Sequence, residues 1–185
     1  MACGGLRCFI ACIQLAKAGG ASAIYVTASS SDKIDFCVKE LGATAGFNYK
    51  SQEWAKELLE VTHGTGVDII IDFIGAAYFQ GNLDAAAHDG HIVTLGALGG
   101  TTLPAEVDIG AFIRKRIRYE GSTLRSRGIE YQGRLRDKLE SFLLQFEEGS
   151  FKVFVEKVFK WEDVIEAHKL METNKTKGKI ICTID

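Results

Sequence analysis

The 185-residue sequence has a single proline, two methionines and almost no net charge. Its 22 Lys and Arg against 24 Asp and Glu give a formal net charge of -2, so no overall field draws the chain to nucleic acid or an anionic membrane. It lacks an apolar run near the ~20 residues of a membrane span, and its N-terminus lacks the basic and apolar segments of a secretory signal. We interpret the basic stretch 114–136 as a solvated face. The expectation is a cytoplasmic protein that binds neither nucleic acid nor membrane.

Metal and nucleophile motifs are also missing. The five cysteines are odd in number and none forms a Cys-x-x-Cys pair, which indicates free thiols in a reducing compartment. The four histidines are scattered, with no partner at metal-ligand spacing, and no serine lies in a G-x-S-x-G setting. We therefore expect no metal site, and the motifs identify no catalytic residue.

The regular feature of the sequence is an alternation of strand and helix patterns. Strands separated by ten- to fifteen-residue helices predict an α/β fold with a doubly wound parallel sheet. The segment Val67–Ile74 is nearly all apolar and suits a strand buried on both faces. Asp89–Gly90 is predicted as a turn. Expected strands cover residues 23–28, 45–49, 67–74, 91–96, 119–124, 154–160 and 179–184, and expected helices cover 6–18, 31–41, 51–61, 78–87, 109–115, 164–171 and one long stretch between 131 and 146.

Ligands of doubly wound sheets bind where the strands end, so the loops after the strands are the places to search. An Asp or Glu after the 23–28 strand would hydrogen-bond the ribose of NAD, but this sequence has three serines there, followed by Lys33. Hydroxyls and a cation at a helix start suit the 2′-phosphate of NADP(H). The alternative is an ordinary serine N-cap and a solvated lysine. We interpret Asp32 as a partner of the helix dipole.

The glycine fingerprint G-x-G-x-x-G is absent, and Gly4-Gly5-Leu6-Arg7 is the candidate pyrophosphate turn in its place. A frayed terminus is the alternative interpretation of that segment. Asp72 ends a strand before Gly75, a position where a carboxylate usually accepts hydrogen bonds from loop amides; a role on the cofactor side is the alternative.

Several stretches in order resemble a known family, the zinc-independent medium-chain dehydrogenases/reductases. Within it the sequence is most similar to quinone oxidoreductases of the zeta-crystallin type, and especially to the tumour-suppressor-inducible group. The stretches that carry the resemblance are residues 13–17, 40–43, 47–50, 72–75, 89–96, 121–127, 166–172 and 178–180.

The resemblance implies a domain organisation and a cofactor. Residues 1–150 would form an NADP(H)-binding Rossmann domain, and residues 151–185 a remnant of the GroES-like catalytic domain that normally precedes it. The first Rossmann strand has no counterpart, and bulky residues 7–9 stand where relatives have a glycine-rich turn. Thr176 stands where close relatives often have Asn. The cofactor-binding residues that the resemblance and the loops imply together are Ser30, Lys33, Tyr49, Gly75, Gly96, Leu98, Leu124 and Arg125.

Three functions remain open at this point. The first is an NADPH-dependent quinone oxidoreductase that transfers hydride to quinones or activated alkenes, here as a cofactor-domain fragment. The second is a non-catalytic module for cofactor binding or dimerisation, and the third is a 2-enoyl reductase of the same superfamily. The chain itself is thus not assigned as an enzyme. The resemblance further implies a homodimer paired near Gly121.

Overall fold

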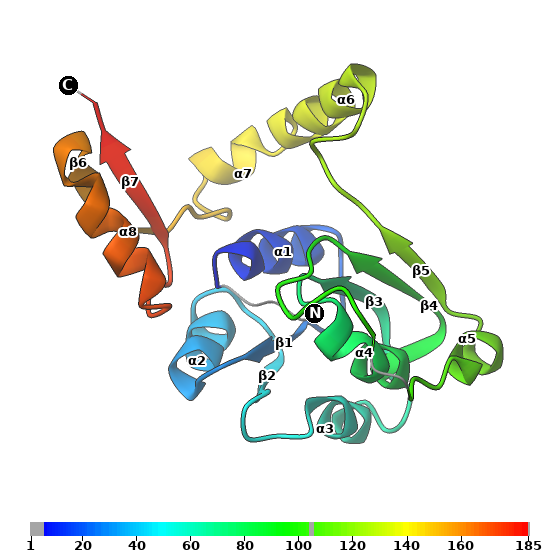
Figure 1. The fold of residues 1–185 in the computed structure, drawn as a ribbon. Coiled ribbons are helices and arrows are strands. Elements are labelled where there is room, and N and C mark those ends of the chain that lie inside the picture. The colour runs from blue at the N-terminus through cyan, green and yellow to red at the C-terminus, as the bar shows by residue number, and fades with distance from the viewer. Residues whose placement is uncertain (1–5, 104–105, 185) are drawn as a thin grey trace. The chain divides into compact units, whose positions relative to one another are not determined.

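The computed structural model describes residues 6–103 and 106–184, which divide into two compact units between Ser122 and Thr123. All strand pairs in the described residues are parallel (Figure 1). In the first unit β1 pairs with β2, and β3, β4 and β5 pair in that order. These strands are β1 (Tyr25–Ala28), β2 (Ala45–Asn48), β3 (Val67–Asp72), β4 (Ala86–Thr94) and β5 (Arg118–Gly121).

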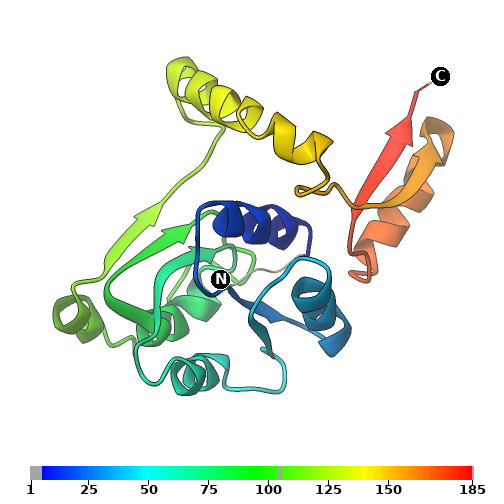
Figure 2. The same cartoon turned by 180° about the vertical axis from the view of Figure 1, so that it is seen from behind.

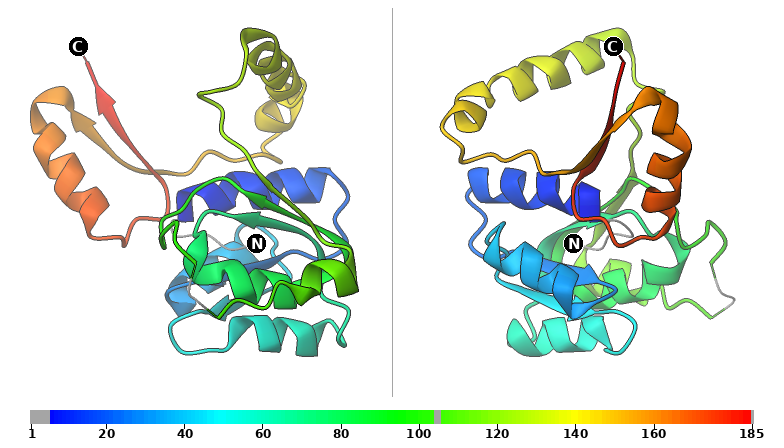
Figure 3. Two further views of the ribbon diagram at one scale, coloured as in Figure 1. Left: turned by 45° about the vertical axis from the view of Figure 1, so that its right-hand side comes forward. Right: turned by 90° about the vertical axis from the view of Figure 1, so that its left-hand side faces the viewer.

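Helices lie on both sides of these strands, which confirms the doubly wound α/β fold. The helices α1 and α2 lie on one face and α3, α4 and α5 on the other (Figures 2 and 3). Glycines with left-handed φ end the first two helices: Gly20 at φ 80° and Gly42 at φ 79°. The helical elements are α1 (Leu6–Ala18), α2 (Ser31–Lys39), α3 (Trp54–Val61), the 3₁₀ turn η1 (Ala76–Tyr78), α4 (Phe79–Ala85) and α5 (Gly110–Lys115).

One buried cluster joins the two groups of strands. Phe47 of β2 packs in the same buried cluster as Ile70 of β3 and Ile92 of β4, under Leu58 and Leu83 of the covering helices. Yet within the described residues β1 pairs only with β2, and β3 only with β4. In a sheet of this winding the first strand would lie between those two edges.

Two details of the strands differ from expectation. The prediction that β3 is buried on both faces is wrong, because Ile70 is 2% exposed but Ile69, on the opposite face, is 63% exposed. A strand is buried on both faces only where other elements cover both. The Asp89–Gly90 turn lies inside β4 as an irregularity, with a register shift against β3 and Asp89 at φ 60°.

The second unit contains α6 (Ile129–Glu140), α7 (Leu143–Glu147), β6 (Val155–Lys160), η2 (Trp161–Asp163), α8 (Val164–Glu172) and β7 (Lys179–Thr183). The prediction of one long helix between residues 131 and 146 is wrong, since the helix ends at Glu140. The Ser141 hydroxyl donates to the Lys138 carbonyl at 2.6 Å, and the Phe142 ring stacks on Phe151 at 5.2 Å. These local contacts favour a break over helix continuation.

None of the helices in the described part of the chain has the length and apolar character that a membrane crossing requires.

Cys37 on α2 is expected to resist alkylation in the folded protein. Its side chain is fully buried, and burial raises the pKa of its thiol to about 11. Cys182 on β7 is only half-buried. With iodoacetamide near neutral pH, peptide mass spectrometry should find Cys37 modified at least about tenfold more slowly than Cys182, since the thiolate is the reacting form. Equal rates in urea are the control, and equal rates in the native protein would contradict the burial of Cys37.

Candidate functional site

The carboxyl ends of β1 and β2 bring two short loops together. Ala28 and Asn48 are partners in the parallel register, and the Tyr49 amide donates to the Ala28 carbonyl at 3.2 Å. The serine loop after β1 and the Tyr49–Lys50 segment after β2 therefore lie at the same edge. Three of the predicted cofactor-binding residues, Ser30, Lys33 and Tyr49, belong to this edge.

Ser30 occupies the N-cap position of α2 in an extended conformation, but its side chain makes no capping hydrogen bond. The Ser30 backbone carbonyl accepts the first ordinary helical bond, from the Ile34 amide at 3.2 Å. The hydroxyl is thus not used for the ordinary capping role that was the alternative interpretation. It remains at the start of α2, three residues before Lys33.

Lys33 shares the edge with a second cation that the sequence search did not single out. Burial lowers the pKa of the half-buried Lys33 ammonium, and the charge of Lys50 lowers it further, while Asp32 raises it. Lys50 is exposed, and its amide is held by the Asn48 side chain at 3.1 Å. Two like charges near one another repel, and an anion between them would relieve that repulsion. The signal in the sequence was the position of Lys50, directly after Tyr49 and past a strand end.

An aromatic cluster stands behind this edge. Tyr78 of η1 meets Tyr49 edge to face at 6.1 Å and stacks on Trp54 of α3 at 5.0 Å. Its hydroxyl lies 3.3 Å from the Thr27 hydroxyl of β1. Tyr78 thereby links the ends of β1 and β2 to the loop after β3. The sequence pattern had marked Trp54 only as part of an apolar helix side, and Tyr78 only as a helix start.

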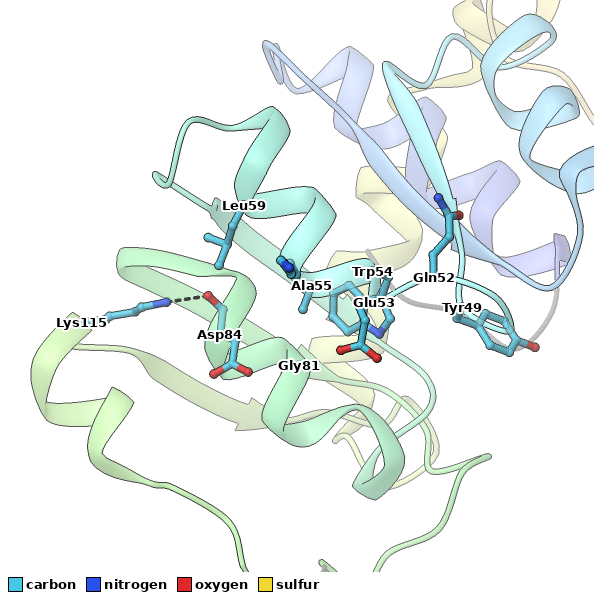
Figure 4. A pocket seen from close by; sticks show the side chains of 10 residues that line it. Tyr49, Gln52, Glu53, Trp54, Ala55, Leu59, Gly81, Asp84 and Lys115 are labelled. Carbon is cyan, nitrogen blue, oxygen red and sulfur yellow. Dashed lines mark hydrogen bonds between the residues drawn. The ribbon is translucent and has the colours of Figure 1, made fainter.

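A cavity of about 650 Å³ lies between α3 and α4, with Tyr49 at one end and Lys115 at the other (Figure 4). Lys115 donates to the backbone carbonyls of Leu83, Asp84 and Ala86 at 2.6 to 3.1 Å, so its three N–H groups serve the C-terminal end of α4. The other charged groups of the lining are Glu53, Asp84 and Lys56. With Lys115 occupied, this lining does not favour an anion, in contrast to the edge at Lys33.

The loops after β3 and β4 form a second cluster, which contains Gly75, Gly96 and Leu98. Backbone hydrogen bonds join them: the amides of Leu98, Gly99 and Ala76 donate to the carbonyls of Phe73, Ile74 and Gly100 at 3.1, 2.7 and 2.9 Å. Gly75 has φ 80° and ψ -127°, and a Cβ there would lie 2.8 Å from the Gly100 carbonyl oxygen. A side chain at Gly96 would meet the Phe73 carbonyl at 3.1 Å, whereas Leu98 is 74% exposed.

The buried side chain of Asp72, the last residue of β3, forms hydrogen bonds with the backbone of this second cluster. Its carboxylate, fully buried, accepts hydrogen bonds from the Ile74 amide at 2.7 Å and the Gly75 amide at 3.1 and 3.2 Å. This confirms the expectation that Asp72 serves loop amides. Burial raises the pKa of this carboxyl, and hydrogen bonds from those amides, Asn82 and Thr94 counteract the rise.

The remaining candidates do not belong to the described part of the first unit. Leu124 and Arg125 belong to the second unit, where both are exposed. Gly4 and Gly5 of the candidate pyrophosphate turn lie outside the described residues.

Within residues 6–103 and 106–184, no three His, Cys, Asp or Glu side chains gather as metal ligands would. The described residues thus offer no fit for a zinc ion.

Comparisons with known proteins agree with this architecture. The family profile described as zinc-binding dehydrogenase matches residues 10–141. A zinc-type alcohol dehydrogenase-like protein of Schizosaccharomyces pombe is 30% identical over 98% of the chain, which spans 50% of that relative.

Two solved structures are similar over 95% of the chain. An NAD-dependent alcohol dehydrogenase has a TM-score of 0.78 at 31% identity, and Escherichia coli quinone oxidoreductase complexed with NADPH has a TM-score of 0.76 at 25% identity. The chain covers 48% and 53% of them, so it spans about half the length of the proteins it resembles.

Proposed function

Because the chain belongs to the zinc-binding dehydrogenase family, a part of the medium-chain dehydrogenase/reductase superfamily, we propose that it is the NADPH-binding part of a quinone oxidoreductase. The observation that carries the proposal is the pair of cations, Lys33 and Lys50, at the carboxyl ends of β1 and β2. No acidic residue stands in the loop 29–31, where one would bind the ribose of NAD. Ser30, Lys33, Tyr49 and Lys50 would hold the 2′-phosphate. The cofactor chemistry is hydride transfer to a quinone or an activated alkene.

The two loop clusters have separate tasks in this proposal. The Lys33 edge recognises the phosphate by charge and hydrogen bonding. The linked loops at Gly75, Gly96 and Leu98 support the nicotinamide half, with glycines that let the backbone approach closely. Leu124 and Arg125 of the second unit are proposed to face the same half. Residues 1–150 would be the cofactor domain and 151–185 the return to the catalytic domain.

The proposal extends to the subgroup of the family, the place of action and the oligomeric state. We expect membership of the tumour-suppressor-inducible group, action in the cytoplasm and a homodimer paired through β5 near Gly121. In the described residues β5 pairs only with β4, so its outer edge has no partner strand. A 2-enoyl reductase would use the same cofactor site, and substrate profiling separates the two.

Titration of the purified 185-residue chain with each nucleotide tests the cofactor. Charge-assisted hydrogen bonds to a phosphate contribute about 1.5–3 kcal/mol, so NADPH should bind at least about tenfold more tightly than NADH. Nucleotide fluorescence or calorimetry measures both dissociation constants. Equal constants for the two nucleotides would overturn the assignment of the phosphate site.

A second assay addresses the alternative of a non-catalytic module. The chain is mixed with NADPH and a simple quinone, and absorbance of the reduced nucleotide is followed. Turnover would exclude the non-catalytic module. Binding without turnover would favour it.

A further inference from the structure

Asp72 is a fully buried carboxylate to which the proposed function gives no task. Its Oδ1 atom accepts a hydrogen bond from the Ile74 amide at 2.7 Å, and both of its oxygens accept from the Gly75 amide, at 3.2 and 3.1 Å. In the part of the chain that the structure describes, no ion pair involves this carboxylate. A buried charge is unfavourable unless hydrogen bonds replace its lost hydration. The carboxylate and the two loop amides therefore hold one another in place.

The loop after β3 is in turn bonded to the loop after β4. The Gly99 amide donates to the Ile74 carbonyl at 2.7 Å, and the Ala76 amide donates to the Gly100 carbonyl at 2.9 Å. Ile74 thus donates to Asp72 with its amide and accepts from Gly99 with its carbonyl. A single residue connects the buried carboxylate to the second loop.

Close backbone contact leaves the two loops little freedom to move separately. A Cβ at Gly99 would lie 2.7 Å from Cγ2 of Ile74, and a Cβ at Gly75 would lie 2.8 Å from the Gly100 carbonyl oxygen. Gly75 also has φ 80° and ψ -127°, a conformation that its surroundings must maintain. Its amide is one of the two that Asp72 binds, so a shift of the carboxylate would disturb the contact with the second loop as well.

We propose that Asp72 is a positioning residue for both loops: its carboxylate fixes the backbone at Ile74 and Gly75, and this backbone fixes the residues after β4, from Gly96 to Gly100. Asp72 would act through the loops and would not touch the nucleotide. The inference rests on the proposed function for its link to the nicotinamide half. The coupling between the loops concerns only groups of the first unit and can be tested without any nucleotide.

Hydrogen exchange by NMR tests this coupling in Asp72→Asn. The variant keeps the shape of the side chain and replaces one acceptor oxygen by an NH₂ group, which cannot accept an amide hydrogen bond. The amides of Gly75 and, in the other loop, Gly99 should exchange at least about tenfold faster, since hydrogen bonds to charged groups contribute about 1.5–3 kcal/mol. The Leu95 amide is the internal reference, because it donates to the backbone carbonyl of Asp72 at 2.7 Å, a group that the variant retains.

Two results in Asp72→Asn would overturn the proposal. Faster exchange at Gly75 with unchanged exchange at Gly99 would show that the loops are not coupled. A uniform acceleration that includes Leu95 would show that Asp72 stabilises the first unit in general and does not position these loops.

Asp68→Asn is the matched control. Asp68 lies on the same strand but is exposed, so its replacement removes the same charge and leaves the loop amides bonded. Exchange of the Gly75, Gly99 and Leu95 amides should stay within about twofold of the wild type, since exposed substitutions usually change stability by less than about 0.5 kcal/mol. An acceleration equal to that in Asp72→Asn would contradict the proposal, because loss of charge alone would then explain it.

A measurement on the wild type covers the case in which Asp72→Asn does not fold. The Leu98 amide donates to the Phe73 carbonyl at 3.1 Å, so it reports on the second loop alongside Gly99. If the two loops open as one unit, the amides of Gly75, Leu98 and Gly99 should have protection factors within about threefold of one another and the same dependence on urea. Protection factors that differ between the loops by more than about tenfold would overturn the coupling.

Nucleotide binding connects the positioning to function. Asp72→Asn should weaken NADPH and NADH by the same factor, about fivefold or more, which corresponds to about one hydrogen bond. Binding of 2′,5′-ADP, which carries the 2′-phosphate but no nicotinamide, should change by less than about twofold because the edge at Lys33 is distant from the change. An equal loss for 2′,5′-ADP would contradict a role in the nicotinamide half. If the wild type binds none of the three, the proposed function fails, while the exchange results still decide the role of Asp72.

Discussion

Replacement of Lys33 and Lys50 together by alanine is expected to abolish the preference for NADPH over NADH. Each cation would make charge-assisted contacts to the 2′-phosphate, and loss of about 1.5–3 kcal/mol raises a dissociation constant about 10- to 150-fold. Lys33, the half-buried member of the pair, should account for the larger share. Parallel titrations with the two nucleotides measure the effect. The dissociation constant for NADH, which lacks the 2′-phosphate, should change by less than about twofold.

Lys39→Ala is the matched control for the double variant. Lys39 lies on the same helix as Lys33, but its ammonium is already paired with Asp35 at 2.7 Å, on the exposed surface. Its removal should leave both affinities unchanged, since exposed pairs contribute little. An equal loss of NADPH and NADH in the double variant would show that the lysines support the fold or the adenosine in general and do not recognise the phosphate.

Gly75→Ala is expected to destabilise the first unit and to weaken the binding of both NADPH and NADH at least about tenfold. The methyl group would lie 2.8 Å from the Gly100 oxygen and 3.1 Å from the Ala97 Cα, and φ 80° is strained for alanine. The left-handed conformation costs about 1–2 kcal/mol and overpacking about 1–3 kcal/mol, against a total domain stability of roughly 5–15 kcal/mol. Urea denaturation measures the loss of stability.

Gly64→Ala separates the two causes. Gly64 has the same φ of 80°, but nothing lies within 4 Å of the Cβ position. Gly64→Ala should lower the free energy of unfolding only by the cost of the left-handed conformation, and the protein should still bind nucleotide. If the two variants lost equal free energy of unfolding, the close contact between the loops after β3 and β4 would have no energetic weight.

Most of the secondary structure follows from local pattern. The helix Leu6–Ala18 was predicted to the residue because its apolar spacing runs without interruption into Gly19-Gly20. The strands ending at Ala28 and Asn48 were likewise predicted within two residues. The predictions failed where packing decides. The break after Glu140 depends on the stacking of Phe142 with Phe151, a contact that helical periodicity does not contain.

The candidate site shows the same division. Ser30 and Lys33 could be picked from the sequence because the strand end and the residue types mark them, and Tyr49 because of the family resemblance. Lys50 could not, since a lysine after a strand is usually a solvated residue and only the parallel register puts its charge near Lys33.

The sequence by itself determined the α/β class, the order of the elements, the strand ends at which to search and the family, since all four depend on periodicity and on short motifs along the chain. The tertiary structure decided which side chains act together. It brought the ends of β1 and β2 to one edge, joined the loops at Gly75 and Gly96, and buried Asp72 against the backbone amides that follow β3. The physical reason is that charge repulsion, desolvation and close contact depend on distance in space, and residues far apart in the chain contribute to each of them.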